Sequence, residues 1–537
     1  MHFSQLTIHC PEKYIVGALP SPPVANCFPF PLPNQASTPI QNGHELTKYF
    51  NTVIFLVLKL FCTSSEEMQL VKGYMWAILA VAMALALFIT FYTFSCQDIH
   101  RYLTRTDVSV SSDSDSWKAA AQSEFLLADW LNVANHKRLS VDLDWSSIKM
   151  KPKPEKSEMN DKWVVITTIN YPTDDVKKLA KMDGWKVVVV GDTKTPSDWS
   201  HPNCVFLSVK RQKELGYRIA DLLPYKSYAR KNIGYLYAIQ HGAKYIYDTD
   251  DDNHPTSGKL EFHDKEKGEY YIYKTSANVV NPYANFGQRT IWPRGYPLQN
   301  ISAPMVKTFV KCKNVQTSIQ QGVVDGDPDV DAIFRLTRKD ENVRLDVKFD
   351  PKAPPILLPP GTMAPFNSQN TFFLDKGLWA LLIPITTKFR VCDIWRGYWG
   401  QRLLWEIGGH LSFFPPNAMQ YRSAHDYHLD FVDEVDLYND AGRLVEFLRE
   451  WKSPRKDFFS RALDLTVSMV DNRFMFPKDA ILTEAWLYDL VSIGYKVPSL
   501  SPTPKECKEI IQDKVVLEPN EQPSSYLSAG KKLVRVS

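Results

Sequence analysis

The pattern of apolar and polar positions is most regular between residues 163 and 247. Four short runs there are almost wholly apolar and rich in β-branched or aromatic residues: WVVITTI (163–169), WKVVVVGD (185–192), CVFLSV (204–209) and KYIY (244–247). Such runs are typical of strands that are buried on both faces. Helical signals separate them, in TDDVKKLAKMDG (173–184) and over about 227–241. Strands that alternate with helices predict a parallel, doubly wound α/β sheet.

Both helical stretches carry boundary signals. Thr173 can cap the start of the first helix, two acidic residues suit its positive first turn, and Gly184 can close it. The second helix is expected to stop at Gly242. These signals place the helices between the strands, as a doubly wound sheet requires.

A longer apolar run lies upstream. Residues 73–97 contain no charged side chain, and a bilayer span needs roughly 20 apolar residues. This run predicts a single transmembrane signal anchor. The shorter run 52–62 carries Lys59 and is interpreted as a failed or interfacial segment. Basic residues flank both sides of 73–97 about equally, and we assign a type II anchor with most of the chain lumenal.

Composition narrows the class of protein. The 537 residues are 44% hydrophobic and 23% charged, as in a globular protein, and the net charge of +3 gives no case for a nucleic-acid partner. The cysteines form no CxxC pair, so a zinc ribbon is unsupported. A disulfide can form in an oxidising lumen, but its pairing cannot be read. The sequon that starts at Asn300 predicts a glycosylation site if that region is lumenal.

A cluster of carboxylates follows the fourth predicted strand. Four of them occupy five positions: Asp248, Asp250, Asp251 and Asp252. Like charges this close repel one another unless a positive charge shares the space. Ligands bind at the carboxyl ends of strands in doubly wound sheets, and carboxylate oxygens suit Mg²⁺ or Mn²⁺. An Asp-x-Asp pair there predicts a metal that neutralises a diphosphate.

Two other interpretations of the acidic cluster were weighed. An EF-hand loop would need Gly and Glu where the sequence has Asn253 and Lys259, so that interpretation fails. A solvated acidic loop is the simpler alternative. The metal-diphosphate interpretation is preferred because the cluster follows a buried strand rather than a polar linker.

The chain resembles the STELLO-type glycosyltransferases, which are Golgi type II membrane proteins. The matching stretches are WVVITTINYPTDDVKKLAKMDGWKVVVVGD, TPSDW, YARKNIGYLYAIQHGAKYIYDTDDD, NPYANFGQRTIWPRGYPL, DGDPDVDAIFRL, APFNSQNT and FRVCDIWRGYWGQRLLWEIGG. YIYDTDDD, WPRGYP and DIWRGYW are also similar to the reversibly glycosylated polypeptide family. The resemblance implies a GT-A-like, Rossmann-like nucleotide-sugar fold and a Golgi location.

The resemblance also implies roles for the acidic residues. By match to Asp-x-Asp, the expected metal ligands are Asp248 and Asp250, with Asp252 as a further candidate. The competing register, Asp250-Asp251-Asp252, resembles the DDD of the reversibly glycosylated polypeptides. The sequence does not separate the two registers.

Residues at the ends of the first two strands are expected to bind the nucleotide. Thr168 lies at the first strand end, Tyr171 could stack on uracil, and Asp192 could accept a hydrogen bond from ribose or base. A turn residue and a helix cap are the alternatives for Tyr171 and Asp192. Arg230 or Lys231 could face the diphosphate, with a solvated pair as the alternative.

Asp393, in DIWRGYW, is the first candidate for a catalytic base that takes the proton of the acceptor hydroxyl. The alternative is a helix N-cap in front of Trp395. In DGDPDVDAIFRL, Asp327 is expected to cap a helix and Pro328 to occupy its first turn. His425 and His428 are three positions apart; a surface or core histidine is the preferred interpretation of each, with a third metal ligand as the alternative.

These observations predict a probable Golgi glycosyltransferase that uses Mn²⁺ or Mg²⁺ and a UDP-sugar to glycosylate a glycan or protein. The alternative is a catalytically weak scaffold or trafficking partner of other glycosyltransferases. The expected segments are a cytosolic, disordered start (1–72), the anchor (73–97), a stem (98–158), a GT-A-like domain (159–425), a helical extension (426–518) and a flexible tail (519–537).

Overall fold

The computed structural model describes residues 144–523, apart from gaps at 258, 261, 263–267, 316, 339–344, 422–425, 502–506 and 508. All of them fall within one compact unit, Asp113–Ser537. No helix in this described part is long and apolar enough to cross a bilayer. The predicted anchor, residues 73–97, lies outside the described residues, as do the predicted cytosolic segment and most of the stem.

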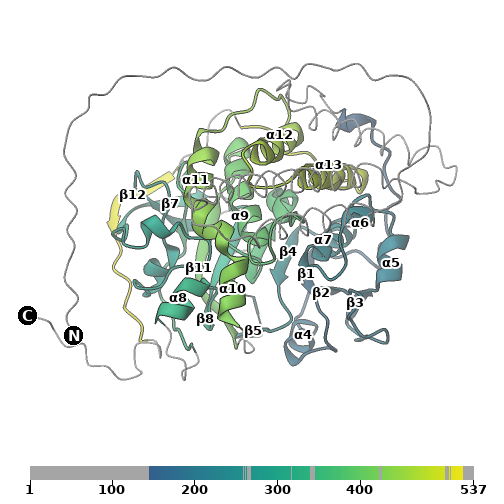
Figure 1. The fold of residues 1–537 in the computed structure, drawn as a ribbon, viewed down its shortest axis with the longest axis horizontal. Helices are drawn as coiled ribbons and strands as arrows, with labels where there is room; N and C mark the ends of the chain where they lie inside the picture. The colour runs from purple at the N-terminus through teal and green to yellow at the C-terminus, as the bar shows by residue number, and fades with distance from the viewer. Residues whose placement is uncertain are drawn as a thin grey trace, which may run out of the picture. The chain divides into compact units, whose positions relative to one another are not determined.

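One mixed sheet forms the centre of the fold (Figure 1). Its described strands lie in the order β12-β7-β6-β9-β11-β8-β10-β4-β1-β2-β3, with β5 paired to β11. The neighbours β4, β1, β2 and β3 are parallel, and β10 joins β4 antiparallel. One end of the sheet is therefore Rossmann-like, and the mixed remainder extends from β10 to β12.

The bounds of the strands follow the apolar runs closely in the parallel part. These strands are β1 (Lys162–Thr167), β2 (Lys186–Val190), β3 (Cys204–Leu207) and β4 (Tyr245–Thr249). The others are β5 (Asn253–Pro255), β6 (Gly268–Tyr273), β7 (Thr308–Val315), β8 (Ile319–Gly326), β9 (Ile356–Leu357), β10 (Asn370–Leu374), β11 (Leu411–Gln420) and β12 (Glu509–Val516). The four strands predicted between residues 163 and 247 are confirmed, but β3 lies at the sheet edge and is only partly buried.

Helices connect the parallel strands and cover the sheet. They are α4 (Asp174–Leu179), α5 (Val209–Glu214), α6 (Ile219–Leu222), α7 (Lys231–Gln240), α8 (Ala332–Arg338), α9 (Cys392–Leu404), α10 (Tyr427–Asp433), α11 (Val435–Glu450), α12 (Phe458–Asp471) and α13 (Pro477–Ser492). Short 3₁₀ helices lie at Trp145–Ser147, Tyr228–Arg230, Pro282–Phe286, Leu298–Asn300, Asp375–Leu381 and Trp405–Ile407. The predicted helix over 227–241 is therefore a 3₁₀ turn followed by α7.

The start of α4 follows the sequence prediction, but Gly184 does not close the helix, which ends at Leu179 with Ala180 as its C-cap. The Thr173 side chain accepts a hydrogen bond from the Val176 backbone N–H and caps the helix. Gly184 and Gly242 have φ values of +76° and +88°, a conformation that glycine adopts without a steric penalty. The prediction for Asp327 is wrong, because α8 begins at Ala332 and Asp331 accepts from the Phe334 N–H. Asp327 instead pairs with Arg335 at 2.7 Å.

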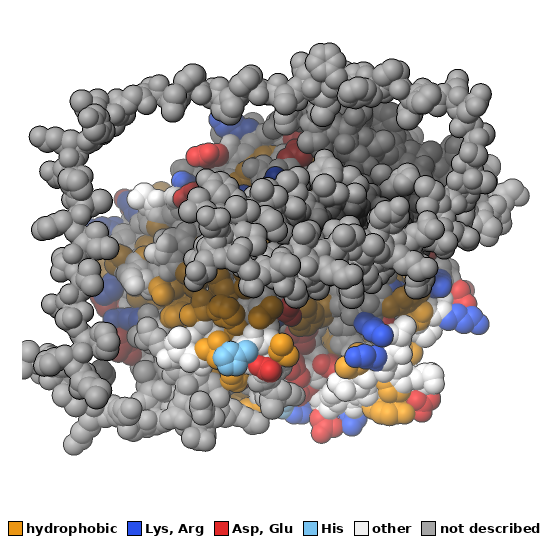
Figure 2. Space-filling view, viewed as in Figure 1, with side chains coloured by type: hydrophobic (Ala, Val, Ile, Leu, Met, Phe, Trp, Pro, Cys, Tyr) orange, Lys and Arg blue, Asp and Glu red, His pale blue; other side chains and the backbone are white. Residues whose placement is uncertain are grey.

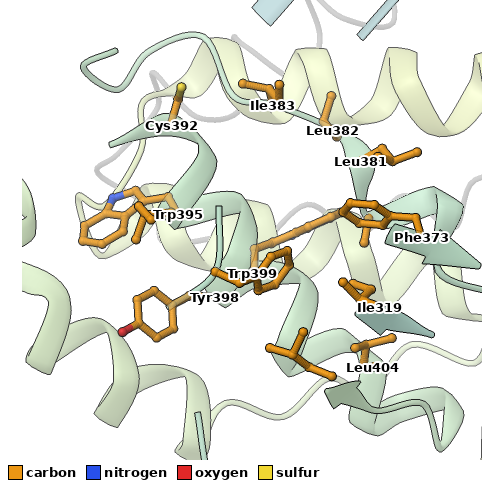
Figure 3. Packing of buried hydrophobic residues seen from close by; sticks show 14 of the residues in the cluster. Ile319, Phe373, Leu381, Leu382, Ile383, Cys392, Trp395, Tyr398, Trp399 and Leu404 are labelled. Atoms are coloured by element: carbon orange, nitrogen blue, oxygen red, sulfur yellow. The ribbon is translucent and has the colours of Figure 1, made fainter. Parts of the chain in front are cut away.

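The helix α9 is the centre of the hydrophobic core. All thirteen of its residues are buried, and it packs against α11 and α12. Figure 3 shows Trp395, Tyr398 and Trp399 from this helix among side chains of the neighbouring elements. The Trp399 ring N–H donates to Thr466 of α12 at 3.0 Å, so even the polar atom of this large ring is satisfied. The core therefore fixes α9 rigidly behind the sheet.

The C-terminal part of the described chain returns to the sheet. Residues 426–518, predicted as a helical extension, contain α10 to α13 and then β12, which pairs antiparallel with β7 at the sheet edge (Figure 1). A disulfide joins Cys312 of β7 to Cys507, two residues before β12. This is the pairing that the sequence alone could not provide.

An apolar surface lies on α10. Leu429 and Val432 are 66% and 58% exposed, and Phe431 is 38% exposed. Figure 2 shows hydrophobic side chains gathered where Figure 1 places this helix. The same helix keeps Asp430 buried, on the side that packs inward.

Candidate functional site

A pocket of about 520 Å³ opens at the carboxyl ends of β1, β2 and β4. This volume lies in the range of small-molecule sites, and the location is where doubly wound sheets bind ligands. Its lining comes from six parts of the chain: residues 167–170, 190–194 (without 193), 226–230 (without 229), 250–252, 389–390 and Gln420. The sheet brings these parts together although they are more than 250 residues apart in sequence.

Three of the four clustered acids line this pocket. The Asp250 carboxylate accepts from the Tyr228 hydroxyl at 2.7 Å, and Lys231 Nζ lies 3.4 Å from the same oxygen. Asp252 accepts from Gln420 Nε2 at 2.9 Å. These neutral and charged donors hold the acidic side chains at the end of β4.

Asp251 connects the same loop to the end of β1. Its Oδ2 accepts from Thr168 Oγ1 and, at 3.2 Å, from Asn170 Nδ2. Its backbone carbonyl accepts from Thr173 Oγ1 at 2.7 Å, so the residue that caps α4 also holds the acidic loop. Thr168 therefore lies at the site as predicted, and Asn170 was not singled out by the sequence.

Asp248 lies elsewhere, and its assignment as a metal ligand requires correction. Its side chain is fully buried and does not line the pocket. Lys231 Nζ lies 2.7 Å from one oxygen and Arg396 Nη1 lies 3.0 Å from the other. The Tyr235 hydroxyl donates to it as well. Two cations already compensate this carboxylate, so it acts within the core, and the geometry favours the Asp250-Asp251-Asp252 register.

The pair formed by Asp250 and Asp252 fits a divalent cation that is also bound by a substrate phosphate. Within the described residues, no three His, Cys, Asp or Glu side chains form a ready metal site. Mg²⁺, however, is usually held by one or two carboxylates together with substrate phosphates. Burial raises the pKa of Asp250 to about 7; Lys231 lowers it, and the charge of Asp252 raises it again. A cation bound at Asp250 and Asp252 would offset both the cost of burying the Asp250 charge and the repulsion between the two carboxylates.

The remaining nucleotide candidates take different positions. Asp192 lines the pocket, and it also accepts backbone N–H bonds from Thr193 and Ser227. Burial alone would raise the pKa of Asp192, but these backbone donors hold it below its ordinary value. Tyr171 is 61% exposed, bonds Asp198 at 3.1 Å and is not among the pocket-lining residues. The structure thus brings Asp192 to the site and leaves Tyr171 outside the pocket wall.

Arg230 and Lys231 are both buried, so the alternative of a solvated pair is wrong. Arg230 lines the pocket, but its guanidinium donates to Gln212 and to the Leu223 carbonyl. Lys231 Nζ donates to the Thr249 carbonyl at 2.6 Å and pairs with Asp248. Both cations are committed to protein partners, and Lys231 alone of the two contacts the acidic residues at the end of β4.

Asp393 lies in the first turn of α9, away from the pocket wall. It pairs with Arg294 at 3.0 Å and also accepts from the Ser368 backbone N–H. Arg294 pairs in turn with Asp329 at 2.8 Å. Asp393 therefore belongs to a buried ion-pair network and is not among the residues that line the pocket.

The other predicted positions lie apart from the pocket. Asn300 ends a 3₁₀ turn (Leu298–Asn300) whose following residues, Ile301 and Ser302, are exposed, so the sequon is on the surface. His428 is exposed on α10 and does not line the pocket.

The sequence missed three pocket residues on the far side of β4: Phe389, Arg390 and Gln420. Phe389 and Arg390 end an irregular loop before α9, and Gln420 ends β11. No spacing or charge pattern distinguishes them in the sequence. Only the mixed half of the sheet, which follows from pairings distant in sequence, brings Gln420 to the acidic loop.

A Rossmann-like parallel sheet with an acidic pocket at its carboxyl edge defines the class: an α/β protein with a fold that fits the glycosyltransferases. Residues 390–510 match the family model of the STELLO glycosyltransferases. Two Arabidopsis thaliana proteins, named Probable glycosyltransferase STELLO1 and Probable glycosyltransferase STELLO2, are each 41% identical over 373 residues, 67% of this chain and 48% of the relative. The STELLO-type resemblance is therefore confirmed, and the chain spans about half the length of these curated relatives.

Proposed function

We propose that the chain is a metal-dependent glycosyltransferase that moves a sugar from a nucleotide-sugar, a UDP-sugar in our assignment, to a glycan or protein acceptor. The observation that carries the proposal is the position of Asp250 and Asp252. They lie at the carboxyl end of β4, inside a pocket that also contains Thr168 and Asp192 from the neighbouring strand ends. The resemblance to the STELLO-type glycosyltransferases implies a GT-A-like donor site with this arrangement of acids and strand ends.

Mn²⁺ or Mg²⁺ bound at Asp250 and Asp252 would supply positive charge for a donor diphosphate. The protein's own contribution is to hold these carboxylates in place. Tyr228 and Gln420 donate to them, and Lys231 lies behind them. Preorganised groups of this kind need no rearrangement when charge develops on the leaving diphosphate.

The assignment of Asp393 as the catalytic base stays a prediction, and the ion pair of Asp393 with Arg294 stands against it. Its carboxylate would have to leave Arg294 before it could accept a proton from a hydroxyl. Removing one partner from a buried ion pair is strongly unfavourable, because the other charge remains uncompensated. We therefore assign Asp393 to positioning Arg294 and leave the base unassigned.

We also propose a lumenal location, in a Golgi membrane, for the described region. Cys312 and Cys507 are disulfide-bonded, and stable disulfides form in oxidising compartments such as the secretory pathway. A type II anchor at residues 73–97 and glycan attachment at Asn300 belong to the same proposal.

Calorimetry of the full-length chain in detergent tests the donor site. UDP and several UDP-sugars are titrated with and without Mn²⁺, for the wild type and for Asp250→Asn and Asp252→Asn. The exposed Asp183, which does not line this pocket, supplies the matched control Asp183→Asn. We expect binding that requires Mn²⁺ and is lost in both pocket variants but kept in the control. A folded wild type that binds no nucleotide would favour the scaffold alternative.

A further inference from the structure

We propose that Phe389 and Arg390 form an acceptor subsite, where the pyranose ring of a carbohydrate acceptor binds beside the acidic pocket. The inference rests on the proposed function, because it assigns the second substrate of the same pocket. It selects a carbohydrate rather than a peptide as the group that contacts this wall.

Phe389 presents its ring to the solvent inside a polar pocket. The side chain is 62% exposed and lines the pocket together with Asp250 and Asp252. One edge packs against Tyr228, with ring centroids 5.8 Å apart and planes at 88°. Tyr228 in turn donates to Asp250 at 2.7 Å. The exposed ring is thus fixed directly beside the acidic side chain.

An exposed phenyl ring selects the chemistry of its partner. It offers no hydrogen bond, and its faces carry the negative part of the ring quadrupole. The C–H groups on one face of a pyranose are weakly positive and form an apolar patch that matches such a ring. The hydroxyls at the edge of the same sugar remain available to polar neighbours.

Arg390 is the polar neighbour that such a sugar would meet. Its side chain is 6% exposed and lines the same pocket. Its Nε donates to Glu434, but its buried Nη2 makes no hydrogen bond to any described residue, and Asp329 Oδ1 lies 3.9 Å away. A buried donor without a hydrogen-bond partner is costly, and a ligand oxygen would satisfy it.

The strand order places this wall opposite the nucleotide end of the pocket. Thr168 and Asp192 come from β1 and β2, on one side of β4. Gln420 ends β11, and Arg390 approaches Asp329, which follows β8, on the other side of β4. A donor diphosphate held at the end of β4 would carry its sugar between the two sides. The Arg390 side of this wall is therefore positioned for the acceptor rather than the base, and Phe389 joins it to Tyr228 beside Asp250.

The test measures saccharide and nucleotide binding separately in the full-length chain. The detergent has no sugar head group, since a glycosidic detergent would compete for the site. Saturation-transfer NMR in the presence of UDP and Mn²⁺ screens the methyl β-glycosides of glucose, galactose, mannose, xylose and glucuronic acid, and calorimetry gives the Kd of UDP. The variants are Phe389→Ala, Phe389→Tyr and Arg390→Lys. Phe476→Ala is the control, because Phe476 is 64% exposed and does not line the pocket.

We expect at least one glycoside to bind and its Kd to rise roughly tenfold in Phe389→Ala, a loss typical of an aromatic contact. Phe389→Tyr and the control should keep wild-type affinity. Arg390→Lys should weaken the glycoside and also lower the melting temperature, because Arg390 pairs with the buried Glu434, so its binding is measured where the variant is folded. The Kd of UDP should change less than twofold in each. Absence of glycoside binding while UDP binds, or a tenfold loss of UDP affinity in Phe389→Ala, would overturn the subsite. Failure of UDP to bind the wild type would instead remove the proposed function, and Phe389-dependent glycoside binding would still support this wall.

Discussion

Lys231 Nζ lies 2.7 Å from the Asp248 carboxylate, and both side chains are fully buried. Arg396 completes the contact from α9, 3.0 Å from the second oxygen. The Asp248 carboxylate therefore joins α7 and α9 to the C-terminal end of β4, while the next three acids line the pocket. The cluster divides into one structural acid and a group of acids available to a ligand.

This division predicts that two similar substitutions, Asp248→Asn and Asp252→Asn, affect the stability of the fold to different extents. Asp248→Asn leaves Lys231 and Arg396 without a full negative charge in the core, and breaking a buried pair costs about 3–5 kcal/mol. We expect a large fall in the urea midpoint of the full-length chain, measured by fluorescence. Asp252→Asn changes a carboxylate at the exposed end of the loop and should leave the midpoint close to wild type. Equal stability of the two variants would contradict the assignment.

The contact between α7 and the sheet predicts a steric effect at Gly234. A Cβ atom there would lie 2.6 Å from Val190 and 2.7 Å from Val165, closer than real contacts allow. Because the neighbours are packed strand residues, Gly234→Ala should destabilise the fold by about 1–3 kcal/mol. The matched control is Gly400→Ala in α9, where the nearest atom to the added Cβ would be the Cβ of Ala380, 3.3 Å away. Thermal melts that show no difference between the two would refute the packing argument.

Asp489 gives the stability a pH dependence. Burial raises its pKa to about 7, although the Arg218 and Ile219 backbone N–H groups lower it. The unfolded value is about 3.9, so the folded state holds an extra proton between these two values. Its contribution is complete below about pH 4 and is lost as the pH rises towards 7. Melting temperatures at pH 5, 6, 7 and 8 should therefore fall more steeply for the wild type than for Asp489→Asn.

The comparison between the wild type and Asp489→Asn isolates the Asp489 contribution, because the two share all other titrating groups. Asn offers a single oxygen to two N–H donors, so the variant should be less stable at pH 5 by an amount that shrinks as the pH rises. A pH-independent difference between the two curves would show that Asp489 is ionised in the folded protein throughout this range.

The disulfide predicts local protection at the sheet edge. Cys312 and Cys507 are separated by 195 positions, and loss of a native disulfide typically costs about 2–5 kcal/mol. Cys507→Ser should release β12 first, seen as faster hydrogen exchange in β12 and β7. Cys204→Ser is the control, because this thiol is free and lies in β3. Unchanged exchange in β12 would mean that strand pairing alone holds the edge.

The parallel half of the fold was predictable because its signals are local. Each of β1 to β4 is an apolar run bounded by a turn, and Thr173 and Gly184 mark the ends of α4 and its following turn. The acidic loop was placed correctly at a strand end for the same reason. Its register stayed open, since the charges that compensate the buried Asp248 come from Lys231 and Arg396, and Arg396 lies 148 positions away.

The rest of the fold depends on pairings between distant segments. β12 joins β7 although Cys312 and Cys507, which link the two, are 195 positions apart, and no local pattern in EIIQDKVV identifies that partner. Arg390 and Phe389 reach the pocket only because tertiary packing brings the loop before α9 to the end of β4. Side chains of ordinary type in irregular segments carry no periodic signal, so sequence patterns miss them.

The position of β12 has a consequence for biosynthesis. At roughly 5–20 residues per second, the ribosome needs about 10–40 s to make the 195 positions that separate Cys312 from Cys507. During that interval β7 has been made but its outer neighbour has not, so a row of backbone N–H and C=O groups waits unpaired. A nascent chain with such an edge is a substrate for chaperones and oxidoreductases, and closure of the sheet is a late step in its maturation.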